Sequence, residues 1–305
     1  MILMEPEQLI APDGLRHLFV SDMDGTLLDD CSRISPETAA ILSWLGRRGV
    51  LFTVATARTP ASVEPLMSHT YTSLPTIVMT GAAMWNRSRQ CYESCHLMDK
   101  TTAEGVLETC LANGIHPFMY RFLEGDDHIL RVYHSPIMSQ KEREFMDDRR
   151  HLPLKRFHLV DETDIKEMPP TDMILFFTIG EKEAVYAAAN LIRARFDCSV
   201  SSYPDIFNHR LAVMEVFAPE VSKGEAVRHL ARKTGADRVT VFGDNLNDIA
   251  MMEEADTGIA VANAQPKVIE AADKVIGPNT ADSVARYILD FYTGLDRLPP
   301  SDYDE

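Results

Sequence analysis

The sequence lacks several features that mark common protein classes. No stretch of its 305 residues approaches the roughly 18 uninterrupted apolar residues of a membrane-spanning helix. The first residues have neither the basic segment nor the long apolar core of a signal peptide. Basic residues are few, because 30 Lys and Arg stand against 46 Asp and Glu, a net charge of −16. Nucleic acids and anionic membranes favour a basic surface, so we expect a cytoplasmic protein that binds neither.

Cysteine is also scarce. The five cysteines are an odd number scattered along the chain, and Cys91 and Cys95 have no second pair at metal-ligand spacing. This pattern is typical of reduced thiols and does not favour a zinc site or a disulfide framework. A small phosphorylated substrate stays compatible with the acidic composition, because a metal ion and one or two local cations suffice to accept an anion.

Strand-like and helix-like segments alternate along the chain, which favours a parallel sheet covered by helices. Between residues 84 and 218 the pattern changes to helices mixed with hairpin-like strands, including a turn at residues 124–127. We therefore predict two domains, and the sequence carries no feature that indicates an oligomeric state. The predicted segments are an N-terminal extension (1–16), a discontinuous α/β domain (17–83 and 219–296), an inserted domain (84–218) and a disordered tail (297–305).

Two carboxylates follow the first predicted strand. The apolar run that begins at His17 ends in Asp22 and Asp24, and Gly25-Thr26 comes next. Unpaired charge is unfavourable inside a protein, whereas open α/β sheets bind ligands at the carboxyl ends of their strands. Such a pair suits covalent phosphoryl transfer, in which one carboxylate attacks phosphorus and the other acts as general acid and base. The alternative is an Asp-Gly turn without a catalytic role.

A second acidic motif follows a later predicted strand, residues 238–242. Asp244 and Asp248 add two carboxylates at a strand end. Oxygen ligands of this kind suit Mg²⁺, which prefers one or two carboxylates together with substrate phosphate and water. Asp248 is also expected to cap the helix that follows.

Two further positions suit phosphate binding. Thr56 ends a predicted strand, where a hydroxyl and backbone amides can donate hydrogen bonds to phosphate oxygens. Lys223 begins a predicted helix, and a cation at a helix N-terminus forms an anion site. Each of these two signals alone is weak evidence for a phosphate site, because strand-end threonines are usually caps and lysines at helix starts are usually solvated.

The combination of these motifs, in this order, resembles the haloacid dehalogenase-like (HAD) superfamily and most closely its Cof-type phosphatase branch, subclass IIB. The resemblance covers residues 17–290 and implies an α/β fold, a Rossmann-like parallel-sheet core with an inserted α+β cap domain. The segments that carry it are DMDGTLL (22–28), ATAR (55–58), TGA (80–82), VSKGEAV (221–227), GDNLNDIAMM (243–252) and Asn263-Ala264.

The resemblance also implies roles for individual residues. Asp22 would be the nucleophile and Asp24 the general acid and base. The phosphoryl group would be bound around Thr56, Ala57, Lys223 and Asn247. Mg²⁺ would be held by Asp22, the backbone carbonyl of Asp24, and Asp244, with support from Asp248.

The chain departs from the family pattern at several positions. Ala57 replaces the usual Gly before Arg58, and Thr80 replaces the usual Asn, which puts the contacts of that Asn in question. No departure touches the nucleophile, the acid/base or the metal positions. Candidate substrate contacts, each more often a solvated side chain, are Arg58 and, in the cap, Arg121, His128, Asn208, His209 and Arg210.

The sequence thus favours a Mg²⁺-dependent phosphatase that acts on small phosphorylated metabolites, such as sugar phosphates, nucleotides or cofactor phosphates, through an aspartyl-phosphate. One alternative is a phosphotransferase or mutase, which passes the phosphoryl group to a sugar hydroxyl. Another is a non-enzymatic phospho-acceptor module, although such a module needs neither Asp24 nor a large cap.

Overall fold

The computed structural model describes residues 7–122, 128–161, 171–205 and 208–298. The chain divides into two compact units, one formed by residues 1–93 and 222–305 and the other by residues 94–221. The predicted turn at 124–127 and all but the first two residues of the predicted tail lie outside the described residues.

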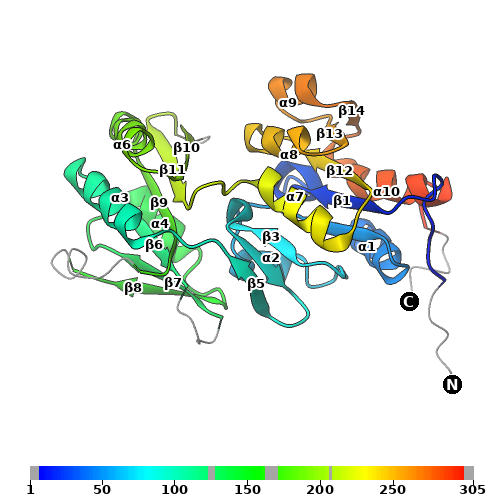
Figure 1. The fold of residues 1–305 in the computed structure, drawn as a ribbon, viewed down its shortest axis with the longest axis horizontal. Helices are drawn as coiled ribbons and strands as arrows, with labels where there is room; N and C mark the ends of the chain where they lie inside the picture. Colours follow the sequence, from blue (N-terminus) through cyan, green and yellow to red (C-terminus); the bar gives the residue numbers. More distant parts are fainter. Residues whose placement is uncertain (1–6, 123–127, 162–170, 206–207, 299–305) are drawn as a thin grey trace. The chain divides into compact units, whose positions relative to one another are not determined.

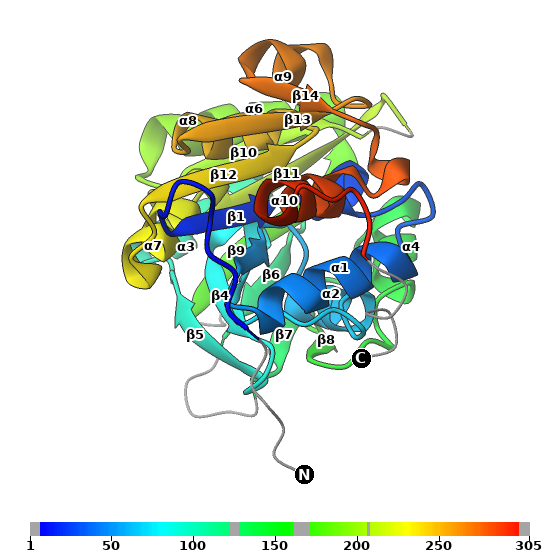
Figure 2. The same ribbon diagram turned by 90° about the vertical axis from the view of Figure 1, so that its right-hand side faces the viewer.

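The first unit contains a five-stranded parallel sheet in the order β14-β13-β12-β1-β2 (Figures 1 and 2). Its buried strands are nearly continuous apolar runs, as expected for a parallel sheet covered on both faces. The strands are β1 (His17–Ser21), β2 (Leu51–Val54), β12 (Arg238–Gly243), β13 (Thr257–Val261) and β14 (Lys274–Ile276).

Helices cover this sheet. After Ser35, whose side chain accepts a hydrogen bond from the Thr38 amide, α1 begins at Pro36 as predicted. The connection from β1 to β2 and that from β12 to β13 run in opposite directions across the sheet. Because crossovers between parallel strands are right-handed, we expect α1 and α8 to cover opposite faces. The helices are α1 (Pro36–Arg47), α2 (Pro60–Leu66), α7 (Lys223–Thr234), α8 (Ile249–Glu253), α9 (Pro266–Ala271) and α10 (Ser283–Thr293), with short turns η1 (Met23–Leu27), η2 (Met79–Gly81), η3 (Leu246–Asp248) and η4 (Asn279–Ala281).

A small three-stranded sheet completes the first unit. It consists of β3 (Thr76–Val78), β4 (Ala83–Asn86) and β5 (Cys91–Cys95). The boundary predicted at residue 84 falls inside β4, and β4 pairs with β3 of the core. The division between the two units comes later, after Glu93 and inside β5.

The second unit is built on a six-stranded mixed sheet in the order β10-β11-β9-β6-β7-β8. Most neighbours are antiparallel, but β7 and β8 are parallel and are joined through α4. The elements are α3 (Lys100–Ala112), β6 (Phe118–Arg121), β7 (Leu130–His134), α4 (Gln140–Asp147), β8 (Lys155–Leu159), β9 (Met173–Glu181), α6 (Lys182–Arg195), β10 (Ser199–Pro204) and β11 (Leu211–Phe217). The predicted fold class, an α/β core with an inserted α+β domain, is confirmed.

The two faces of this sheet differ. Helices α3 and α6 lie on one face (Figure 1) and close a core that includes Met119, Phe176 and Ile192. On the opposite face α4 packs against β9, where Phe145 stacks on Phe177 with ring centroids 4.7 Å apart. The strand β8, which the sequence did not indicate, forms one edge of the sheet.

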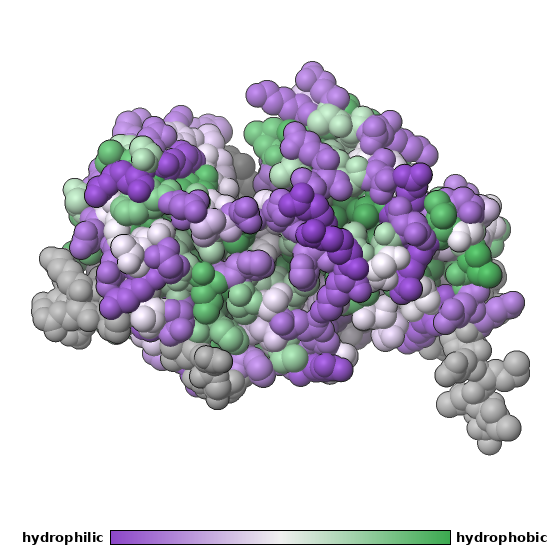
Figure 3. All heavy atoms as spheres, viewed as in Figure 1, coloured by the Kyte–Doolittle hydropathy of each residue, from purple (hydrophilic) through white to green (hydrophobic). Residues whose placement is uncertain are grey.

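No helix among the described residues is long and apolar enough to cross a membrane. In the view of Figure 3, hydrophilic residues cover most of the visible surface and the hydrophobic areas are small and separate. This surface agrees with the strongly acidic composition.

Adjacent residues of α6 provide a test of the second unit's core. Ile192 is fully buried, whereas Leu191 is 45% exposed. We expect Ile192→Ala to lower the free energy of unfolding by about 2–5 kcal/mol, because it leaves a cavity. The matched control Leu191→Ala should change it by less than about 0.5 kcal/mol. Urea unfolding followed by circular dichroism measures both, and equal effects would contradict the assigned packing.

Candidate active site

The carboxyl ends of β1 and β12 bring the two acidic motifs together. The strands are parallel neighbours, with Ser21 opposite Phe242. Asp22 directly follows β1 and Asp244 directly follows β12. The Asp22 amide donates to the Phe242 carbonyl (2.9 Å), so the pairing continues to the first carboxylate. The sheet itself therefore positions Asp22 beside the second motif.

Lys223, the first residue of α7, lies between two carboxylates. Its ammonium donates hydrogen bonds to Asp22 Oδ1 and, at 2.8 Å, to Asp248 Oδ1. All three side chains are buried: Lys223 is 1%, Asp22 6% and Asp248 0% exposed. A buried cation is tolerated only with such partners, so Lys223 joins the start of α7 to both motifs.

Asp248 has a structural part in the site. Its second oxygen, Oδ2, accepts hydrogen bonds from the amides of Asp244 (3.1 Å) and Asn245 (3.0 Å). Both oxygens are therefore engaged, one by Lys223 and one by the backbone that carries Asp244. The arrangement fixes the loop after β12.

Asp244 is oriented from the first motif. Thr26 Oγ1 donates to Asp244 Oδ1 at 2.8 Å. Gly25 lies so close that a Cβ on it would be 2.5 Å from Asp244 Oδ2, and its φ of +77° is one that L side chains rarely adopt. Glycine is therefore required at position 25 by both the conformation and the space.

Negative charge is concentrated in this site. Burial, reinforced by Asp248 and Asp244, raises the pKa of Asp22 well above its usual range, although Lys223 acts in the opposite direction. Burial raises the pKa of Asp244 to about 6, partly offset by the hydrogen bond from Thr26. Burial disfavours the charged form of Lys223, but the two carboxylates outweigh it and raise the pKa of its ammonium. One lysine thus faces three carboxyl groups.

The donor set fits a divalent cation. Asp22, Asp244 and Asp248 each offer a carboxylate oxygen, and these oxygens lie within 4.8 Å of one another. An all-oxygen set of carboxylates suits Mg²⁺. A divalent cation would favour the charged forms of Asp22 and Asp244, which burial and, to a smaller extent, the neighbouring carboxylates disfavour.

Asp24 turns away from this cluster and pairs with Arg58. The guanidinium donates from Nε to Asp24 Oδ2 at 2.7 Å and from its terminal nitrogen to Oδ1 at 2.5 Å. The side chain of Asp24 is 51% exposed. The hydrogen bonds that Arg58 donates to Asp24 raise the pKa of Arg58, against the effect of burial. The sequence indicated Arg58 only as a possible substrate contact, because its direction depends on the local backbone.

The segment after β2 approaches the same edge of the sheet. The buried Thr56 hydroxyl accepts a hydrogen bond from the Arg58 amide at 3.1 Å, and Ala57 between them is exposed. The Thr80 amide donates to the Thr56 carbonyl at 3.0 Å. Thr80 has a φ of +57°, unfavourable for a β-branched residue. Its hydroxyl is buried without a hydrogen-bond partner among the described residues.

Two asparagines differ in their contacts. Asn247, predicted beside the phosphate, is exposed and has no side-chain hydrogen bond within the described part of the chain. Asn263 donates to the Gly25 carbonyl at 2.7 Å and accepts from the Asn279 amide at 2.9 Å. Asn263 therefore links the turn of the first motif to the loops after β13 and β14. In the sequence, only the resemblance of Asn263-Ala264 to the family pattern pointed to this residue.

The candidate contacts of the cap lie in the second unit. Arg121 is buried and its guanidinium donates to the carbonyl and hydroxyl of Thr171, at 2.9 and 3.0 Å. His128 has a φ of +59°. Asn208 accepts from the Arg210 amide at 3.1 Å in the turn before β11, and His209 beside it is exposed. Arg121 and Asn208 thus already have roles in the local structure of the unit.

Comparison with known proteins identifies relatives over most of the chain. A family model described as haloacid dehalogenase-like hydrolase matches residues 19–288. The 5-amino-6-(5-phospho-D-ribitylamino)uracil phosphatase YcsE of Bacillus subtilis is 27% identical over 89% of this chain and 94% of its own length. The pyridoxal phosphate phosphatase YbhA of Escherichia coli is 24% identical over 88% of this chain and 95% of its own length.

Solved structures share the fold. The sugar phosphatase BT4131, of HAD subclass IIB, matches with a TM-score of 0.68 over 90% of this chain and 98% of its own, at 20% identity. The region that the family model matches, residues 19–288, includes both acidic motifs and the second unit.

The strain at Thr80 can be tested by substitution. We expect Thr80→Asn to raise the free energy of unfolding by about 1 kcal/mol, because asparagine tolerates positive φ better than a β-branched residue. Thr80→Val should raise it less, since valine removes the unpaired hydroxyl but keeps the strain. Urea unfolding of both variants checks this, and destabilisation by Thr80→Asn would contradict it.

Proposed function

The chain belongs to the haloacid dehalogenase-like hydrolase family, and from this premise we propose that it is a Mg²⁺-dependent phosphatase of small phosphorylated metabolites that works through a phosphoryl ester of Asp22. The observation that carries the proposal is the buried cluster in which Lys223 holds Asp22 beside Asp244 and Asp248. This arrangement presents one fixed carboxylate, one cation and a place for a divalent ion at the adjacent ends of β1 and β12.

Asp22 is the proposed nucleophile. Lys223 holds its Oδ1, so the carboxylate is fixed while Oδ2 attacks phosphorus in line with the leaving group. The bond from phosphorus to Asp22 forms as the bond from phosphorus to the ester oxygen breaks. Lys223 also offsets the charge that gathers on the phosphoryl oxygens.

Asp24 is the proposed general acid and base. It gives a proton to the departing ester oxygen, and in the second step it takes a proton from the water that attacks phosphorus and frees Asp22. Arg58 holds the Asp24 carboxylate through two hydrogen bonds. Arg58 therefore sets the position from which Asp24 gives its proton to the ester oxygen.

Asp22, Asp244 and the backbone carbonyl of Asp24 are the proposed Mg²⁺ ligands, with Asp248 holding the Asp244 loop in place. When bound, the ion would offset the repulsion between the nucleophile and the phosphate and neutralise transition-state charge. Thr56, with the amide of Ala57 after β2, is the proposed site for the phosphoryl oxygens.

The proposed substrates are small phosphate monoesters. Two relatives are named for phosphates of ring compounds, pyridoxal phosphate and a ribitylaminouracil phosphate, and a structural neighbour is named a sugar phosphatase. Sugar, nucleotide and cofactor phosphates therefore make up the panel for a first screen.

The nucleophile is tested by Asp22→Asn. Phosphate release from the panel, measured with and without Mg²⁺, should require the ion and fall by roughly 10³-fold or more in the variant, since the amide is a poor nucleophile. The matched control is Asp290→Asn, which changes an exposed carboxylate of α10 and should leave release unchanged. Normal Mg²⁺-dependent turnover by a folded Asp22→Asn protein would refute the assignment.

The role of Arg58 is tested by Arg58→Lys, which keeps a cation but cannot form the two-pronged contact. For an alkyl phosphate, whose leaving group needs a proton, kcat/KM should fall about 10-fold or more. For p-nitrophenyl phosphate, whose leaving group needs none, it should fall much less. Arg33→Lys, on an exposed pair with Asp29, is the control. An equal loss on both esters would show that Arg58 does not act through Asp24.

A further inference from the structure

The second unit contains a buried lysine without a carboxylate partner. Lys155, at the start of β8, is 4% exposed, and within the described chain no carboxylate lies within ion-pair distance of it. Its ammonium lies near two rings, 5.2 Å from the centroid of Tyr120 and 5.9 Å from that of Phe157. Such cation–π contacts offset only part of the loss of hydration.

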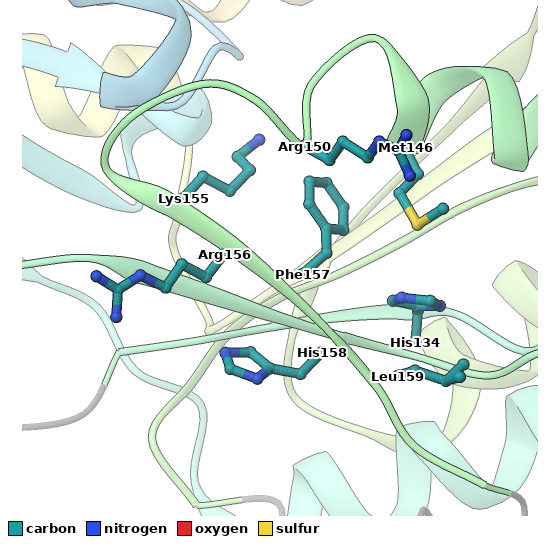
Figure 4. A pocket seen from close by; sticks show the side chains of 8 residues that line it. All are labelled: His134, Met146, Arg150, Lys155, Arg156, Phe157, His158 and Leu159. Atoms are coloured by element: carbon teal, nitrogen blue, oxygen red, sulfur yellow. The ribbon is translucent and has the colours of Figure 1, made fainter.

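Lys155 lines a cavity of about 420 Å³. The alternation along β8 places Lys155, Phe157 and Leu159 on one face of the sheet. Figure 4 shows Lys155, Phe157 and Arg150 extending into the same space. The cavity lies entirely within the second unit, whose β7, β8 and the end of α4 form its walls.

The lining is basic. Arg150, Lys155 and His134 contribute to it on the face that carries Phe157, whereas Arg156 and His158 alternate to the opposite face of β8. No carboxylate is among the eight lining residues. Arg150 has one ion pair with Asp147, at 3.5 Å, between two largely exposed side chains. This local excess of positive charge is notable in a chain with a net charge of −16. An anion is the ligand that such a lining favours.

The rest of the lining is apolar and includes one aromatic ring. Phe157 is partly exposed, and Met146 and Leu159 lie beside it in the wall. A ring offers a stacking surface for a flat ligand, and methionine adapts to ligands of varied shape. The cavity therefore combines a place for a charge with a place for a flat apolar body.

We propose that this cavity is a binding site for a small anion carried on a flat ring, such as a heteroaromatic phosphate or carboxylate. Lys155 binds the anionic group and Phe157 packs against the ring. Burial, helped by the charge of Arg149, lowers the pKa of Lys155 to about 7. An anion in the cavity restores the charged form of Lys155, so binding and protonation support each other.

The test uses pyridoxal 5′-phosphate as the probe, on the full chain carrying Asp22→Asn and with a chelator present, so that the result does not depend on phosphatase activity. The neutral amine of Lys155 adds to the aldehyde carbon, water leaves, and an imine forms. Borohydride then supplies hydride to reduce the imine to a stable secondary amine, which peptide mass spectrometry locates.

We expect Lys155 to be modified about 10-fold or more faster at pH 7.5 than exposed lysines such as Lys100, because more of its amine is neutral. Excess inorganic phosphate should slow this modification, because an anion beside Lys155 keeps its amine charged, and for the same reason pyridoxal without its phosphate should react at least as fast. Modification of Lys155 no faster than that of Lys100, or unaffected by phosphate, would overturn the proposal.

The ligand could be the ring of the substrate or a separate effector, and the kinetics of a Lys155→Met variant distinguish the two. This experiment rests on the proposed function. If the ligand is the ring of the substrate, kcat/KM for a ring-bearing ester should fall about 10-fold while that for a sugar phosphate stays unchanged. If it is a separate effector, a heteroaromatic carboxylate should alter turnover of both esters by the unsubstituted enzyme but not by the variant. Lys100→Met is the control, and a Lys155→Met enzyme unchanged in all these measurements would refute the site.

Discussion

The buried ammonium of Lys223 is the interaction on which the site depends. It neutralises part of the charge of Asp22 and Asp248, which come from two different strand ends, and it is itself the first residue of a helix. Burial of any one of these groups alone would be strongly unfavourable. The three are stable only together, so the start of α7 and the ends of β1 and β12 are held in one arrangement.

The backbone around this cluster is correspondingly restricted. Gly25 passes close to the Asp244 carboxylate, and a Cβ on Gly243 would lie 2.5 Å from the Cβ of Asp248. Each acidic motif therefore has a glycine at the point where an aspartate side chain of the site lies against the backbone. The same close packing explains why carboxylates from separate strands converge within a few ångströms.

The core strands and the acidic residues that follow them could be predicted from the sequence, because apolar runs that end in carboxylates indicate both a buried strand and a site at its end. The strand at Lys155–Leu159 could not, because its residues KRFHL contain too few apolar positions to produce an alternating pattern. The orientation of Asp24 toward Arg58 depends on side-chain directions, which spacing does not determine. The basic cavity was likewise hidden, since His134, Met146 and Lys155 are far apart in sequence and meet only through the β7–α4–β8 crossover.

The second unit is a single continuous segment, residues 94–221, set into a chain whose remaining parts form the parallel sheet. The carboxylates and Lys223 all belong to the other unit. Insertions, deletions and substitutions within this segment can therefore accumulate without altering the charge balance around Asp22. The chain thus has a continuous segment that can change while the buried cluster around Asp22 stays the same.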